Sequence, residues 1–414
     1  MTENIVIIGG GAAGLMAAAA AAEMHCPSII LEPNRLLGKK LRITGKGRCN
    51  VTNNCDIKEF MRNVPRNGKF LYSALNAFSP SDTISFFENA GVPLKTERGR
   101  RVFPVSDSSH DIANALERLA HSGGMRHKKC LAKQIIAENG HVKAVLTSEG
   151  EVPCSAVVLA TGGLSYPGTG STGDGYRMAR ELGHTITDTE GSLVPLESDD
   201  DWCAELQGFS LKNVTLTAFD SAGKRIFSEL GEMLFTHFGV SGPLVLSASA
   251  HMRNFSDEHY RLSIDLKPGL DEKKLDARIL RDFDKYKNRD FANSLSDLAG
   301  HSMIPVLIRL SGIPGDTKVN SITRAQRQRL LELFKAFPVS ISGPRPVEEA
   351  IITSGGISVR EVDPRSMESK LCKGLFFAGE VLDLDAYTGG YNLQIAWSTA
   401  RMAARSACTH KGDS

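Results

Sequence analysis

Hydrophobic positions near the beginning of the chain change from a short continuous run to a longer helical one. Residues Asn4 to Ile8 are mostly β-branched and apolar, as expected of a central parallel strand covered on both faces. An alanine-rich segment then continues to about Met24, and a second short apolar run covers Ser28 to Leu31. This order predicts a strand, a helix and a second strand in one βαβ unit.

The turn between this strand and helix has the sequence GGGAAG, which fits the dinucleotide-binding pattern G-x-G-x-x-G. Gly9 allows the tight turn, Gly11 lets a pyrophosphate reach the backbone, and Gly14 lets the helix pack on the strand. The helix N-terminus offers free N–H groups to phosphates. Glu32 ends the second strand, where its carboxylate can accept bonds from a ribose. The predicted cofactor-binding residues here are Gly9, Gly11, Ala12, Ala13, Gly14 and Glu32.

Later segments also change from strand to glycine turn to helix. The run VVLATGG ends a strand in Thr-Gly-Gly, follows a hairpin-like meander from Cys130 to Pro153, and precedes a helix beginning in STGDGYRMARELGH. Near the C-terminus, GLFFAGEVLDLDAYTGGYNLQIAWSTA predicts a strand ending at Gly379-Glu380 and then a Gly-Gly turn into a helix.

The pattern between these segments is different. VTLTAFD, KRIFSEL and LSIDL alternate polar and apolar positions, which predicts antiparallel strands, and from Asp271 to Phe337 the pattern is helical. We therefore predict an α/β fold: a discontinuous Rossmann-like domain, an inserted antiparallel β domain and a small helical subdomain. The predicted limits are 1–190 with 350–414 for the first, 191–268 for the second, and 269–349 for the helical subdomain and return linker.

Composition narrows the function classes. Lys and Arg number 49 against 47 for Asp and Glu, so no global field attracts nucleic acid or membrane. Eight cysteines without a Cys-x-x-Cys predict reduced thiols, a cytoplasmic protein and no metal site. The apolar N-terminus has no basic start and is broken by glycines, which argues against a signal peptide and against membrane association.

Five motifs together resemble the BaiN/RdsA-type flavoproteins, NAD(P)/FAD-dependent oxidoreductases related to the two-dinucleotide-fold group of glutathione reductase and fumarate reductase. They are EPNRLLGKKLRITGKGRCNVTN, GRRVFPVSDSSHDI, ATGGLSYPGTGSTGDGY, LFTHFGVSGPLVL and GGYNLQIAWSTA, and they span nearly the whole chain. The resemblance implies FAD, with the Ala-Thr-Gly segment beside it, Glu380 on its ribityl or pyrophosphate part, and the final helix directed at the flavin ring. The further candidate cofactor-binding residues are Lys40, Gly45, Gly47, Arg48, Cys49, Asn50, Leu131, Thr161, Gly162, Gly379, Glu380, Gly390, Asn392 and Leu393.

The stretch LLGKKLRITGKGRCNVTN, residues 36–53, allows three interpretations. We favour a cofactor loop, since it directly follows Glu32 and has glycines for close backbone approach and basic groups for phosphate charge. A dithiol is disfavoured because five residues separate Cys49 from Cys55, whereas related disulfide reductases carry Cys-x4-Cys. Cys49 alone is either a proton donor to a substrate or a small buried residue.

The third interpretation is RNA contact, because basic side chains alternate with aromatic ones in two regions. Solvated faces and cofactor contacts explain most such clusters equally well, and the near-neutral net charge weakens the RNA interpretation. The first region holds Lys39, Lys40, Arg42, Lys46, Arg48, Arg62, Arg66, Lys69, Phe70 and Tyr72; the second holds Arg98, Arg100, Arg101 and Phe103.

Hydride transfer through FAD is the predicted chemistry. Only one dinucleotide fingerprint is present, so NAD(P)H is expected as a transient small-molecule reductant. The resemblance implies reduction of an electron-poor C=C bond, either in uracil of ribosomal RNA, giving dihydrouridine, or in a steroid-like enone, with Cys49, Tyr391 or water as acid. The resemblance also implies one alternative, an oxidase of small amines such as aminoacetone. A further alternative is a non-enzymatic RNA-binding protein with structural FAD. We make no prediction of the oligomeric state.

Overall fold

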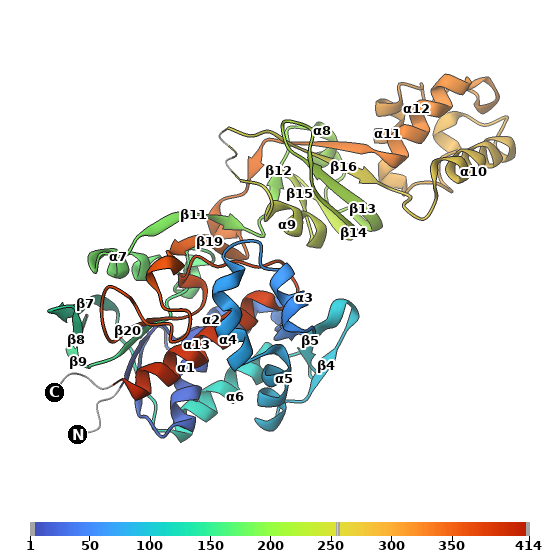
Figure 1. Ribbon diagram of the computed structural model, residues 1–414. Coiled ribbons are helices and arrows are strands. Elements are labelled where there is room, and N and C mark those ends of the chain that lie inside the picture. The colour runs from blue at the N-terminus through green and yellow to red at the C-terminus, as the bar shows by residue number, and fades with distance from the viewer. Residues whose placement is uncertain (1–4, 254, 256, 411–414) are drawn as a thin grey trace. The chain divides into compact units, whose positions relative to one another are not determined.

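The computed structural model describes residues 5–253, 255 and 257–410, and it divides the chain into two units. The first unit joins Met1–Ser192 to Val347–Ser414, and the second is Leu193–Pro346. Figure 1 shows the chain leaving the first unit in green and returning to it in orange and red. The Rossmann-like unit is therefore built from both ends of the sequence.

The first unit is organised around a parallel sheet, which confirms the predicted Rossmann-like α/β class. Within the described residues this sheet has five strands in the order β20-β10-β1-β2-β6, and every neighbouring pair is parallel. Asn4, predicted to begin the first strand, lies outside the described residues. The strands are β1 (Ile5–Ile8), β2 (Ser28–Leu31), β6 (Arg126–Lys128), β10 (Val157–Leu159) and β20 (Leu375–Phe377).

Two helices far apart in the sequence pack side by side against this sheet: α1 (Ala12–Glu23) and α13 (Tyr391–Thr409). Small side chains allow this close packing, because six of the 12 residues of α1 are buried alanines. No helix in the described part of the chain is both long and apolar enough to cross a membrane. The other helices of this unit are α2 (Lys39–Ile43), α3 (Ile57–Arg62), α4 (Tyr72–Ala77), α5 (Pro80–Asn89), α6 (Ser109–Ser122) and α7 (Asp174–Glu181).

Smaller sheets complete the first unit. The predicted meander forms as three antiparallel strands, β7 (Ala132–Glu138), β8 (His141–Thr147) and β9 (Gly150–Pro153). Gly379 and Glu380 lie in a short 3₁₀ turn after β20, not in the strand as predicted. The remaining strands are β3 (Thr52–Asn53), β4 (Leu94–Thr96) and β5 (Arg101–Pro104) in one sheet, with β11 (Ile186–Ser192) and β19 (Ile352–Ile357) in another.

The second unit combines an antiparallel sheet, in the residues described, with helices on its own hydrophobic core. In the described residues the sheet order is β17-β16-β13-β14-β15-β12-β18. Its strands are β12 (Leu196–Glu197), β13 (Ser210–Phe219), β14 (Arg225–Thr236), β15 (Gly239–Ser241), β16 (Tyr260–Asp265), β17 (Phe337–Ile341) and β18 (Gly343–Pro344). The helices are α8 (Asp201–Glu205), α9 (Pro243–Ser249), α10 (Glu272–Lys285), α11 (Ile304–Ser311) and α12 (Arg324–Lys335).

The stretch predicted as a return linker behaves differently from a linker. Residues 337–341 pair with β16 as β17, and residues 343–344 pair with β12 as β18. Both are edge strands of the sheet, and edge strands tolerate Pro338 and Pro344, which lack a backbone donor. Pro338 and Pro344 therefore fit the two edges of the sheet.

Candidate functional site

The glycine turn after β1 has the backbone that the dinucleotide pattern requires. Gly9 has φ of +101°, and a Cβ there would lie 2.5 Å from the Ala160 carbonyl oxygen. A Cβ on Gly14 would lie 1.9 Å from the Gly9 carbonyl oxygen, so α1 can meet the turn only with glycine at this position. A Cβ on Gly11, by contrast, would meet no described heavy atom within 4 Å. Gly11 precedes α1 and supplies no capping side chain to its first N–H groups.

Glu32 is held in a fixed orientation at the end of β2. Its carboxylate accepts hydrogen bonds from the Gly10 backbone N–H at 2.9 Å and from the Asn34 side-chain amide at 2.7 Å. The Asn34 amide also donates to the Thr169 carbonyl oxygen, at 3.2 Å. The acid therefore lies directly beside the glycine turn, and the segment around Thr169 lies next to it.

Lys40 and Glu380, 340 positions apart, form an ion pair beside this turn. The Lys40 ammonium lies 2.8 Å from one Glu380 oxygen and donates to the Ser165 hydroxyl at 2.7 Å. The other Glu380 oxygen accepts from the Ser165 hydroxyl and from the Thr353 backbone N–H, both at 2.9 Å. Both charged side chains are one-fifth exposed. Two predicted cofactor-binding residues are thus brought together from opposite ends of the chain.

The Thr-Gly-Gly segment after β10 passes next to this pair. A Cβ on Gly163 would lie 2.3 Å from the Thr353 hydroxyl and 3.1 Å from Glu380. Gly162 has φ of +76°. The hydroxyl oxygens of Thr161 and Tyr176 are buried and have no hydrogen-bond partner among the described residues. Burial raises the Tyr176 pKa, and the nearby carboxylates raise it further.

The N-terminus of α13 is tied to the residue 36–53 loop. Gly390 has φ of +99°, and a Cβ there would lie 2.4 Å from the Thr52 carbonyl oxygen. When the Asn50 amide is oriented so that both its nitrogen and its oxygen form hydrogen bonds, the oxygen accepts from the Gly390 N–H at 2.9 Å. Asn392 binds the backbone of Ala386 through both ends of its amide. Leu393, the next residue, is partly buried against the core.

The two catalytic candidates flank the Asn50–Gly390 hydrogen bond, because each is the chain neighbour of one partner. Cys49 is completely buried, and burial raises its pKa to about 12. Tyr391 begins α13, is 7% exposed, and packs edge-to-face on Phe60 with ring centroids 5.2 Å apart. A Cβ on Gly389 would lie 3.0 Å from the Tyr391 ring, so glycine leaves room for that ring.

Other cofactor candidates make contacts of their own. The Arg48 guanidinium lies 2.5 Å from Glu97 and 2.6 Å from Asp107, and it stacks on Phe103. These two partners raise the Arg48 pKa. The backbone N–H of Leu131 donates to the Ser148 hydroxyl at 3.2 Å, and its side chain is exposed. Gly45 and Gly47 have φ of +57° and +83°, so both loop positions favour glycine.

The first basic region does not form one solvent-facing cluster. Arg42 is buried and donates to the Leu37 carbonyl oxygen and the Asn114 side chain. Arg48 is paired with acids as described, so both guanidinium groups already have partners within the protein. Lys39, by contrast, is exposed and donates to the Gly168 carbonyl oxygen, and Lys46 is exposed. Local sequence cannot distinguish a paired cation from a solvated one.

The second basic region lies directly beside the turn at Gly389 and Gly390 that precedes α13, called the α13 turn below. Arg98 and Arg100 are exposed on the turn that leads into β5, and Arg101, also exposed, is the first residue of β5. The Asn53 amide donates to the Gly99 carbonyl oxygen at 3.0 Å and to the Gly389 carbonyl oxygen at 3.1 Å. Asn53 is not among the functional residues predicted from the sequence. Its only signal was its place at the end of the NVTN stretch, because the hydrogen bonds cross 46 and 336 positions.

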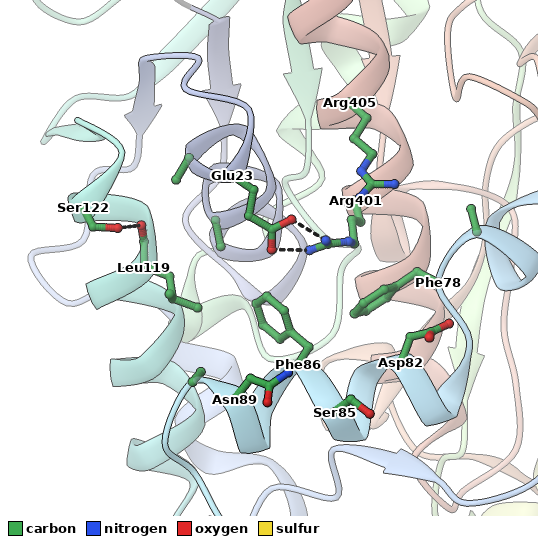
Figure 2. A pocket seen from close by; sticks show the side chains of 14 residues that line it. Glu23, Phe78, Asp82, Ser85, Phe86, Asn89, Leu119, Ser122, Arg401 and Arg405 are labelled. Atoms are coloured by element: carbon green, nitrogen blue, oxygen red, sulfur yellow. Dashed lines mark hydrogen bonds and ion pairs between the residues drawn. The ribbon is translucent and has the colours of Figure 1, made fainter.

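A separate cavity of about 550 Å³ lies along the later parts of α1 and α13 (Figure 2). Its walls include Phe78, Phe86, Glu23, Arg401 and Arg405. A helix of the length of α1 spans about 18 Å, so this cavity lies at the far end of α1 from the glycine turn. None of the predicted cofactor-binding residues lines it.

Comparisons with known proteins find relatives over nearly the whole chain. The family described as HI0933-like protein Rossmann domain matches residues 3–406. The 3-dehydro-bile acid delta(4,6)-reductase of Clostridium scindens is 30% identical over 393 residues, which cover 91% of this chain and 92% of that protein. The ribosomal RNA dihydrouridine synthase of Haemophilus influenzae is 30% identical over 414 residues, covering 98% of each.

Solved structures share this fold, and one of them matches over the full length. It is the 3-ketosteroid delta1-dehydrogenase from Sterolibacterium denitrificans in complex with 1,4-androstadiene-3,17-dione, with a TM-score of 0.52 and 12% identity. The match covers 99% of this chain and 100% of that one. At this identity the likeness concerns the fold alone.

Proposed function

The chain belongs to the HI0933-like protein Rossmann domain family, and on that premise we propose that it is an FAD-dependent oxidoreductase that reduces an electron-poor C=C bond. The leading substrate is uridine in ribosomal RNA, with dihydrouridine as product. A relative at 30% identity is named for this reaction, and another is named as a bile acid reductase. The proposal rests on the residues around the α13 turn.

The residues of the first unit fit FAD. The uncapped N–H groups at the start of α1 and the open side of Gly11 suit a pyrophosphate, and the fixed Glu32 carboxylate suits a ribose diol. The buried hydroxyls of Thr161 and Tyr176 have no protein partner among the described residues, as expected beside a polar ligand. We assign Lys40 and Glu380 to the middle of the cofactor.

FAD, when bound, supplies the hydride that reduces the substrate. The chain must then orient the substrate and deliver one proton. In uracil the C4 carbonyl polarises the C5=C6 bond, so hydride adds at C6 and the proton at C5. We assign the proton to the Tyr391 hydroxyl, because this side chain keeps 7% exposure and Cys49 keeps none. Cys49 then acts as packing beneath the loop.

One observation carries the choice of RNA as substrate. Asn53 links the Gly99 turn, which presents Arg98, Arg100 and Arg101 to solvent, to the Gly389 turn that precedes Tyr391. Cations at this position would neutralise phosphates of an RNA strand whose base reaches the flavin. A small amine carries no phosphate groups, so it would not be bound by three exposed arginines beside the reaction site. NAD(P)H is proposed as a transient reductant, since the sequence carries only one dinucleotide fingerprint.

The test measures dihydrouridine in ribosomal RNA by nucleoside mass spectrometry, in the parent organism and in a deletion strain. We expect the signal to disappear on deletion and to return with the wild-type gene. The triple variant Arg98→Gln, Arg100→Gln, Arg101→Gln should restore it poorly and bind ribosomal RNA fragments about tenfold or more weakly at physiological salt. It should also lower the slope of log affinity against log salt by about 2–3.

A charge-matched control removes three other exposed cations of the same unit: Lys143→Gln, Arg180→Gln and Arg365→Gln. This control should bind RNA and restore dihydrouridine as the wild type does. If both triple variants lose RNA binding and dihydrouridine to the same extent, the loss is explained by the lower net charge, and a specific role for the Gly99 turn is contradicted. An unchanged dihydrouridine signal in the deletion strain would reject ribosomal RNA as the substrate.

A steroid-like enone is the second candidate, favoured by the bile acid reductase relative. It uses the same hydride and proton chemistry on a different conjugated C=C bond. Purified holoenzyme with NADH or NADPH and a 3-keto-Δ4 steroid should then consume the nicotinamide. The triple arginine variant should do so at the wild-type rate, because a neutral steroid makes no phosphate contacts.

A further inference from the structure

Two of the eight cysteines differ from the others, all eight being in the described part of the chain. Six are buried, whereas Cys26 and Cys408 are only partly buried. These two are also each other's partners, because their thiols share a hydrogen bond. The two thiols that are most accessible to a small reagent are therefore the two that lie side by side.

The helices that carry them explain this pairing. Arg401 and Cys408 are seven residues apart in α13, which puts them two turns apart on one helix face. Arg401 donates to Glu23 near the end of α1 at 2.8 Å, and Figure 2 shows these two side chains facing each other. Cys26 follows Glu23 by three residues, and its N–H donates to the Ala21 carbonyl oxygen at 3.0 Å. The same face of α13 thus meets the end of α1 at both positions.

The shared hydrogen bond also makes the two thiols unequal. The bond from Cys408 lowers the Cys26 pKa to about 7, against a raised pKa for Cys408. The lowered pKa increases the share of Cys26 that is thiolate, the form that attacks peroxides and disulfides. The thiols of Cys49 and Cys55 show the opposite behaviour, since burial raises their pKa values to about 12 and about 11.

We propose that Cys26 and Cys408 are a site of oxidative modification that forms a reversible disulfide between the ends of α1 and α13. The oxidant is a peroxide. The Cys26 sulfur attacks one peroxide oxygen, the O–O bond breaks, and water and a sulfenic acid form. The Cys408 thiol then displaces the hydroxyl from Cys26 as a second water. Two thiols are oxidised to one disulfide and one hydrogen peroxide is reduced to two waters.

The test treats purified holoenzyme with a small excess of hydrogen peroxide, blocks free thiols with iodoacetamide, and maps tryptic peptides by mass spectrometry. We expect peptide 1–35 linked to peptide 406–411, with the linkage lost after dithiothreitol. The oxidised protein should melt about 2–8 °C higher than the reduced protein, because the linkage closes a very long loop. The linkage does not depend on the proposed substrate, so either proposal can fail alone.

Variants decide the assignment. Cys26→Ser and Cys408→Ser should each abolish the linked peptide and the rise in melting temperature, whereas the buried Cys203→Ser should change neither. The wild-type peptide map stands on its own if a variant fails to fold. The proposal is overturned if peroxide leaves both thiols open to iodoacetamide, if it carries Cys26 to sulfinic acid without linkage, or if another cysteine is the partner.

Discussion

At the scale of single residues, the Lys40–Glu380 pair is the contact on which the proposed cofactor site depends most. Glu380 accepts from Lys40, Ser165 and the Thr353 backbone, so it joins three segments at once. Truncation of Glu380 removes the acceptor from all of them. Each donor is then left partly desolvated, at a cost of about 1–3 kcal/mol.

We therefore predict that Glu380→Ala purifies with less than half of the flavin bound by the wild type and unfolds at lower temperature. Flavin absorbance per protein and a thermal melt measure the two effects. Glu380→Gln keeps an acceptor for Ser165 and Thr353 and should lose less. The matched control Glu181→Ala removes an exposed acid of α7 that pairs with Arg177, and it should retain flavin fully. Full flavin in Glu380→Ala would contradict the assignment.

For the basic residues, the sequence alone could not show which side chains are solvated and which are paired with acids. Arg42 and Arg48 look like their neighbours in the stretch GKKLRITGKGRC, yet their acidic partners lie about 50 to 75 positions away. Whether a cation is solvated or paired depends on those partners, which no local pattern reveals. Glu32 was easier to predict as a candidate ribose ligand, because that prediction needs only the number of residues between Glu32 and the glycine motif within one βαβ unit.

At the scale of elements, the glycine turn and α1 separate folding from cofactor binding. Gly14 is needed for packing, since a Cβ would meet the Gly9 carbonyl oxygen at 1.9 Å. Gly11 is open on its side-chain side and has φ of −77°, which any residue adopts. The two positions thus have different reasons for being glycine.

We predict that Gly11→Ala folds with the thermal stability of the wild-type apoprotein but binds FAD at least tenfold more weakly. Gly14→Ala should express poorly or melt at lower temperature even without FAD. Apoprotein melts and FAD titration by fluorescence separate the two outcomes. A Gly11→Ala protein that binds FAD normally would contradict a pyrophosphate at the start of α1.

Elements defined by contiguous residues were predictable, and assemblies of distant turns were not. Period and turn residues predict β1, α1 and β2 because each pattern is local. The family resemblance also followed from motifs, and it is confirmed by the match over residues 3–406. By contrast, the two hydrogen bonds through which Asn53 joins the Gly99 turn to the Gly389 turn depend on the folded backbone. The sequence shows that Arg98, Arg100 and Arg101 are clustered along the chain, but it does not show that they lie beside the start of α13.

At the scale of the whole molecule, residues 5–253, 255 and 257–410 form two separate hydrophobic cores, one in each unit. The Rossmann-like core includes Trp397 and Phe60, and the core of the second unit includes Phe334 and Phe337. The proposed FAD residues all belong to the first unit. Ligand binding should therefore stabilise one unit directly.

We predict two calorimetric transitions, of which FAD raises only the one that belongs to the first unit. At 100 times the dissociation constant the gain is about 2.7 kcal/mol. Phe334→Ala empties part of the second core and should lower the other transition, by about 3–5 kcal/mol in unfolding free energy. A single transition that moves as a whole in both experiments would show that the units unfold together.

The pairing of α1 with α13 has a consequence for how the protein is made. On the ribosome, the first βαβ unit emerges early, but the helix that covers α1 is encoded at the other end of the chain. About 370 residues separate Glu23, the last residue of α1, from Tyr391, the first of α13, which is roughly 20–75 s of translation at ordinary speeds. During that time the alanine face of α1 has no final partner. Nascent chains are therefore exposed to chaperones and proteases during this interval, and the proposed flavin site can load only after α13 has been made.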